Sequence, residues 1–210
     1  MNAQSPTSAN DPLSQEDHTR ANMYALIGRL FYAAPDSNLL AEIGQAGASN
    51  EGASGELQLA WQALQDACVS ASPTVIKQEH DILFVGIGKA EVTPYTSHYV
   101  TYNAPDRHLV ALREQLQRWG LARSSGVFEV EDHVAGLCDV MRFLIEEQMS
   151  LADQRLFFER YVYPGMPPLG TAVMAAASAG FYKRVVAFAN AFFEVEKAAF
   201  EMDDSTTRNH

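Results

Sequence analysis

Three carboxylates and a histidine lie close together near the middle of the 210-residue chain. The stretch 129–133 reads Glu-Val-Glu-Asp-His, so the four residues before His133 include three carboxylates: Glu129, Glu131 and Asp132. Carboxylates accept paired hydrogen bonds from the planar fork of a guanidinium group. The charge of a histidine is sensitive to its surroundings near neutral pH. These residue types are suited to binding a cationic partner, which the acidic net charge of the chain also favours.

A long helix, expected from about residue 129 to 149, must position this stretch. Apolar residues recur at helical spacing at Val134, Leu137, Met141 and Leu144, which predicts one buried face. Acidic residues also favour a helix N-terminus because they complement its unpaired N–H groups and the positive end of its dipole. The stretch is therefore either a stabilised helix start or a binding site, and His133 lies at the rim of the buried stripe.

A second segment with candidate functional residues is the irregular connection 86–105. It contains the run Pro94-Tyr95-Thr96-Ser97-His98-Tyr99. Irregular segments of about 20 residues are uncommon inside a compact domain and are often functional. Tyrosine combines an apolar body with a polar tip and is frequent at peptide-binding surfaces. Tyr95 and Tyr99 either line such a surface or cover the core from the loop side.

The remaining patterns predict an all-α fold, a single-domain bundle of about nine helices. Period-2 alternation is nowhere sustained, whereas helix starts are expected at Ser14 and Ser72-Pro73, and helix ends at Gly86 and Gly120. We expect residues 14–202 to form the helical domain, with mobile segments at 1–13 and 203–210. Six phenylalanines are expected in the core: Phe157, Phe158, Phe181, Phe188, Phe192 and Phe193.

The composition excludes several classes of protein. Fifteen basic against 26 acidic residues give a net charge of −11, so a nucleic-acid-binding face is not expected and stable membrane insertion is not expected either. No apolar run approaches the roughly 18 residues that span a bilayer. The first residues lack the basic and apolar regions of a secretory signal. Cys68 and Cys138 belong to no CxxC pair, which favours buried, reduced thiols and a cytoplasmic location.

No catalytic, metal or cofactor site is expected. Glu-x-x-His and His-x-x-x-His pairs, which would hold a metal between helices, do not occur. The chain has no G-x-S-x-G sequence for a nucleophile, and neither cysteine has a histidine beside it. Gly86-x-Gly88 has neither a preceding strand nor the Gly-Lys-Ser/Thr of a phosphate loop. The patterns do not indicate an enzyme.

Several short motifs follow one another with a specific order and spacing. After an entry helix with Arg29-Leu30-Phe31 and Pro35, they are Glu79–Gly86, Pro94–Ser97, Glu129–His133, Phe157-Phe158, Phe181-Tyr182 and Phe192–Glu196. Together these motifs resemble the TorD/DmsD family of redox-enzyme maturation chaperones, and the resemblance covers about residues 20 to 197. Three departures occur. Thr96 replaces the usual Glu, Val130 replaces Pro, and Tyr161–Gly165 stands where the family often has His-Leu and then Trp.

The resemblance implies an all-α chaperone that binds the twin-arginine signal peptide of a molybdopterin oxidoreductase precursor and delays its export. By this resemblance, Asp132 and His133 bind the signal peptide, and Pro94, Tyr95 and Ser97 belong to the loop that faces them. Glu129 and Glu131 are assigned on their chemistry as much as on the family. An apolar groove lined by Tyr95, Tyr99 and Met141 is expected to take the apolar part of the peptide.

The resemblance leaves the client open among reductases for dimethyl sulfoxide or trimethylamine oxide and formate dehydrogenases. The protein is expected to be a monomer or a dimer that exchanges its long 86–105 connection. Two alternative functions remain. In the first, the chain is a helical scaffold for the mature client or for the cofactor-insertion machinery. In the second, the chain binds a nucleotide such as GTP.

Overall fold

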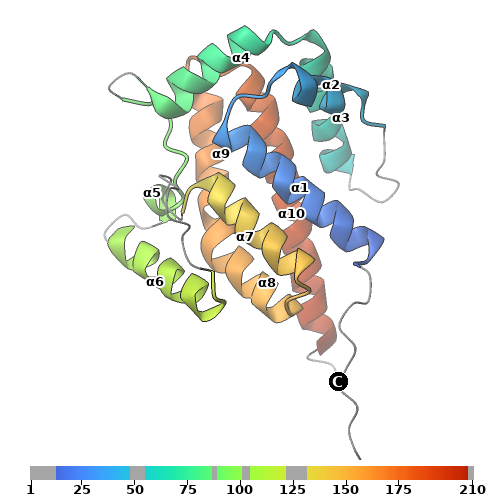
Figure 1. The fold of residues 1–210 in the computed structure, drawn as a ribbon, viewed down its shortest axis with the longest axis vertical. Helices are drawn as coiled ribbons and strands as arrows, with labels where there is room; N and C mark the ends of the chain where they lie inside the picture. The colour runs from blue at the N-terminus through green and yellow to red at the C-terminus, as the bar shows by residue number, and fades with distance from the viewer. Residues whose placement is uncertain (1–12, 48–54, 87–88, 101–104, 122–131, 208–210) are drawn as a thin grey trace, which may run out of the picture.

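The computed structural model describes residues 13–47, 55–86, 89–100, 105–121 and 132–207, and these residues are helical apart from their connections (Figure 1). The α-helices are α1 (Gln15–Tyr32), α2 (Ser37–Gln45), α3 (Gly55–Ser70), α4 (Pro73–His80), α5 (Ser97–Val100), α6 (Pro105–Arg118), α7 (Val134–Glu146), α8 (Leu151–Phe157), α9 (Met166–Ala175) and α10 (Phe181–Thr207). Two π-helical turns, Asp81–Val85 and Phe158–Val162, and a 3-10 turn, Tyr163–Gly165, extend α4 and α8. The predicted all-α bundle is confirmed.

Helix α1 and helix α7 form the closest pair in the bundle and run antiparallel (Figure 1). Gly28 makes this approach possible: a Cβ at this position would lie 3.2 Å from Cβ of Cys138 and 3.4 Å from the carbonyl oxygen of Ala135. The long helix α10 packs against α1, α3, α4 and α9. The N-terminus of α7, which directly follows Asp132 and His133, therefore lies beside the C-terminal half of α1.

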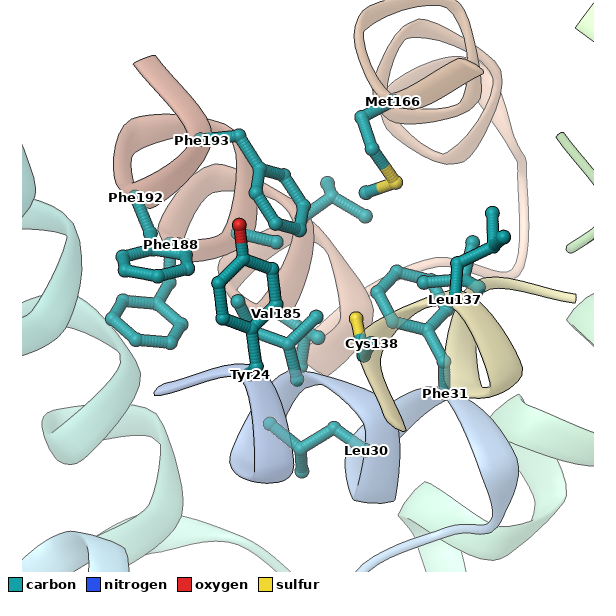
Figure 2. Packing of buried hydrophobic residues seen from close by; sticks show 14 of the residues in the cluster. Tyr24, Leu30, Phe31, Leu137, Cys138, Met166, Val185, Phe188, Phe192 and Phe193 are labelled. Atoms are coloured by element: carbon teal, nitrogen blue, oxygen red, sulfur yellow. The ribbon is translucent and has the colours of Figure 1, made fainter. Parts of the chain in front are cut away.

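The core is rich in aromatic rings contributed by helices that are distant in sequence. Figure 2 shows Tyr24 and Phe31 of α1, Cys138 of α7 and Phe193 of α10 meeting in one cluster. All six phenylalanines expected in the core are buried, which confirms that prediction. Both cysteines are free and buried, as expected. Burial of this apolar surface is the main force that brings the elements together.

Most helix boundaries follow the local signals in the sequence. The Ser14 hydroxyl accepts a 3.0 Å hydrogen bond from the N–H of Asp17 and starts α1. Gly86 and Gly120 have φ of 63° and 72°, the left-handed region that favours glycine after a helix. Ser72 precedes Pro73 as expected but makes no side-chain capping bond.

Helix α10 continues past the expected end near Met202 to Thr207. No glycine or proline follows Phe200, which is buried against the core and holds this last part of the helix. In the described part of the chain, none of the helices is long and apolar enough to cross a membrane.

Candidate functional site

Two segments that the sequence singled out separately lie side by side in the structure. The backbone at Tyr95 pairs with that at His133 in an isolated antiparallel bridge. The N–H of Val134 donates to the carbonyl oxygen of Pro94, and the N–H of Thr96 donates to that of Asp132, both at 3.0 Å. We call the joined residues 94–99, Asp132 and His133 the Tyr95–His133 corner.

Asp132 connects the start of α7 to the short helix α5. Its carboxylate oxygen Oδ2 accepts a hydrogen bond of 3.0 Å from the N–H of Ser97, the first residue of α5. The Thr96 hydroxyl also donates to the carbonyl oxygen of Asp132 at 3.3 Å. The side chain of Asp132 is 1% exposed, so this carboxylate faces the protein interior. This buried hydrogen bond between a side chain and the backbone orients the 94–99 loop.

His133 caps helix α7 and supports Tyr95. Its Nδ1 accepts a 3.1 Å hydrogen bond from the N–H of Ala135, so the neutral imidazole carries its proton on Nε2. Its ring meets the Tyr95 ring edge-on, with the centroids 5.2 Å apart. The expected helix start near residue 129 is therefore wrong for Asp132 and His133, because the backbone here pairs with the 94–96 segment and α7 begins at Val134.

The outer side of the corner is formed by aromatic residues of the loop. Tyr95 and Tyr99 are half-buried and His98 is exposed, whereas Pro94 and Ser97 are buried. The Tyr99 hydroxyl donates to the carbonyl oxygen of Thr93 at 2.9 Å. Burial raises the pKa of Tyr99 above its ordinary value, so the phenol stays neutral. The 86–105 connection is thus not wholly irregular, since it contains α5 within its described residues.

The corner rests on the turn that precedes α9. A Cβ on Gly165 would lie 2.5 Å from Cβ of Thr96, so glycine is required at this contact. Thr96 is fully buried there. Nearby, the buried ring of His108 packs edge-on against Tyr161 with centroids 5.4 Å apart, and its Nε2 has no hydrogen-bond partner within the described part of the chain.

Not every predicted site residue belongs to the corner. Glu129 and Glu131 lie outside the described residues. Met141 was expected to line an apolar groove, but it is fully buried in the core. This expectation is wrong because Met141 lies on the face of α7 that packs into the bundle. Among the described residues, no group of three or more His, Cys, Asp or Glu side chains could hold a metal ion.

Sequence reasoning missed the carboxylates that join distant helices. The Glu79 carboxylate accepts the N–H groups of Gly180, Phe181 and Tyr182 at 2.8, 3.0 and 2.8 Å, respectively, and so caps α10. The Glu196 carboxylate accepts two hydrogen bonds from Arg20, from Nε at 2.8 Å and from Nη2 at 3.0 Å. Both glutamates stand inside motifs noted above, but nothing in the sequence identifies their partners.

The family model described as nitrate reductase delta subunit matches residues 50–169, which is more than half of the chain. The matched range includes both segments of the Tyr95–His133 corner, whereas α1 and α10 lie outside it. No curated protein sequence matches the chain significantly.

Proposed function

Because the chain belongs to the nitrate reductase delta subunit family, a family of chaperones for molybdoenzyme maturation, we propose that it binds a twin-arginine signal peptide. The family match agrees with the resemblance to TorD/DmsD chaperones. The peptide belongs to the precursor of a molybdopterin-containing oxidoreductase. The chaperone acts in the cytoplasm and holds the precursor back from export until its cofactor has been inserted.

The pairing of the two segments at the Tyr95–His133 corner is the observation that carries this proposal. It unites the two motifs that chemistry and resemblance single out, although Thr96 and Asp132 are 36 positions apart in the sequence. Asp132 and His133 are buried and hold the loop and the start of α7. In our proposal they position the site, while Tyr95 and Tyr99 contact the peptide.

The chemistry of the peptide suits the residues around this corner. Glu129 and Glu131 lie three residues and one residue before Asp132 in the chain, and their carboxylates would accept the two guanidinium groups. The apolar segment that follows the arginines would pack on the rings of Tyr95 and Tyr99, which are half-buried. The negative charge of the whole chain, −11, adds long-range attraction for a basic peptide.

The test measures binding of a twin-arginine peptide by calorimetry. We expect the double substitution Glu129→Gln and Glu131→Gln to weaken binding roughly tenfold, since two charged contacts are lost. The matched control is Glu42→Gln with Glu56→Gln, which changes the net charge equally at exposed positions of α2 and α3. Equal weakening by both pairs would contradict a local site and would leave only an effect of total charge.

A second arm tests arginine recognition and the positioning role of Asp132. A peptide with two lysines in place of the arginines should bind more weakly, because lysine cannot form the bidentate contact. Asp132→Asn, with His133→Ala as a further variant, should weaken peptide binding and speed hydrogen exchange at the N–H of Ser97. Faster exchange with unchanged affinity would show that the corner is structural only.

A further inference from the structure

A pocket of about 470 Å³ lies at the end of the α1–α7 pair opposite the Tyr95–His133 corner. One wall comes from residues 13–20 at the start of α1, and the other from residues 145–154 at the joint between α7 and α8. The thirteen residues of α7 separate the two sites by roughly 20 Å, at 1.5 Å per residue. The volume falls in the usual range of ligand pockets.

The pocket contains a buried hydrogen-bond acceptor without a donor. Gln154 lines the pocket and is 4% exposed. Its Nε2 donates to the carbonyl oxygen of Met149 at 2.9 Å, which leaves Oε1 as the free end of the amide. Oε1 has no hydrogen-bond partner among the described residues. A buried acceptor without a donor lowers the stability of the fold, and a ligand with an N–H donor would supply the missing hydrogen bond.

The charges around the pocket are mainly negative. Glu16 is exposed and Asp17 is half-buried in its wall. Arg20 also lines the pocket, but its guanidinium is occupied by the buried carboxylate of Glu196 and, through Nη1 at 3.1 Å, by Asp17. Two carboxylates thus pair with one guanidinium, and Glu16 adds a further negative charge to the same wall. The excess negative charge favours a cationic ligand over an anion.

Apolar side chains complete the wall beside these acceptors. Met149 is half-buried and Leu151 is 49% exposed. Long basic side chains pack their methylene groups on such surfaces while their charged heads reach polar groups. We propose that this pocket binds an arginine or lysine side chain of a partner polypeptide, with its head on Gln154 Oε1 and Glu16 and its stem along Met149 and Leu151.

This inference goes beyond the signal-peptide function and does not depend on it. The two sites lie at opposite ends of α7, so adjacent arginines of one twin-arginine pair cannot fill both. The ligand is a separate basic residue with apolar neighbours on the partner chain. A chaperone with both sites would hold its client at two points, and a bivalent interaction raises the overall affinity without further contacts.

The probe is an acetylated and amidated peptide with one arginine between leucines. Its control contains citrulline, which keeps the shape of arginine but carries no charge. We expect the arginine peptide to shift the NMR signals of the Gln154 side-chain amide and the citrulline peptide to bind several-fold more weakly. Glu16→Gln should weaken the arginine peptide about two- to five-fold.

The matched control for Glu16 is Glu56→Gln, because Glu56 is also an exposed glutamate in the first turn of a helix but lies outside the pocket. Unchanged affinity in this variant supports the proposal. Equal binding of the citrulline peptide, or equal weakening by both substitutions, would overturn it. Loss of binding in the Glu129→Gln, Glu131→Gln protein would also overturn it, because the probe would then occupy the corner instead.

Discussion

The side chains of Asp132 and His133 accept hydrogen bonds from backbone N–H groups in this structure. The carboxylate of Asp132 binds the N–H of Ser97, and the imidazole of His133 binds the N–H of Ala135. Both side chains are therefore helix caps, one for α5 and one for α7. A cap fixes the direction of its helix, so these two residues determine how Tyr95 and Tyr99 are presented. The two interpretations of the 129–133 stretch are compatible for this reason.

His108 should make the stability of the protein depend on pH. Burial lowers its pKa below the ordinary value of 6.5, and the charge of Arg160 also lowers it, although Asp132 opposes this change. The folded state therefore favours the neutral imidazole. This contribution to stability is present above about pH 6.5 and is lost as the pH falls toward the lowered pKa. We expect His108→Phe to reduce the loss of stability between pH 7.5 and 5.5.

Urea unfolding at the two pH values measures this effect. Phenylalanine keeps a ring that can pack against Tyr161, so the variant should fold. The control is His98→Asn, which replaces an exposed histidine, and the pH dependence should change more in His108→Phe than in this control. An identical pH dependence in wild type and His108→Phe would contradict the assignment.

A buried ionic contact between Arg20 and Glu196 joins helices α1 and α10. Glu196 is 3% exposed and binds Arg20 through both of its oxygens, while Tyr24 donates to Oε2 at 3.0 Å. Burial acts to lower the pKa of Arg20, but pairing with Glu196 outweighs it and raises the pKa. For Tyr24, in contrast, burial raises the pKa, so its hydroxyl remains a donor. The contact fixes the register between the two helices.

Removing the charge of Glu196 should destabilise the fold. Glu196→Gln leaves the partly buried guanidinium of Arg20 without its counter-charge, and breaking such a pair costs about 3–5 kcal/mol. The free energy of unfolding in urea measures the change. Glu201→Gln, at an exposed position five residues further along α10, should change the free energy of unfolding by less than about 0.5 kcal/mol. A similar small effect for both substitutions would show that the contact is dispensable.

The whole molecule should unfold as one unit. Cys68 of α3 and Cys138 of α7 lie in the same core cluster. Burial raises the pKa of Cys68 to about 11 and raises that of Cys138 further, so both thiols are protonated and protected at pH 8. For Cys68 the reactive thiolate is about a hundredfold rarer than at the ordinary pKa of 9. We expect both thiols to become reactive at the same urea concentration.

Pulsed thiol labelling in urea, compared with the loss of helical circular dichroism, checks this prediction. Single-cysteine variants, Cys68→Ser and Cys138→Ala, assign the two signals. Earlier labelling of Cys68 would mean that α2 and α3 open separately from the rest of the bundle, contrary to a single domain.

Local sequence patterns were sufficient for most of the fold. The apolar spacing of 3 and 4 residues, Ser14 at a helix start and the glycines at positions 86 and 120 act over one or two helical turns. Their energetics depend on neighbours in the chain, so the all-α class, most helix ends and the phenylalanine core were predictable. The candidate residues Pro94, Tyr95, Ser97, Asp132 and His133 were singled out from their types and their order, and their role in binding stays a prediction.

The tertiary structure decided which of these residues meet and which remain accessible. The pairing of Pro94–Thr96 with Asp132–Val134, the capping of α10 by Glu79 and the Arg20–Glu196 contact all join distant segments. The packing of α7 against the bundle also buries Met141 in the core. Such contacts depend on how helices pack around a shared core, and many arrangements satisfy the same local patterns. The sequence alone therefore determined the elements and the chemistry of the Glu129–His133 stretch, while packing decided that Asp132 faces inward and supports the loop.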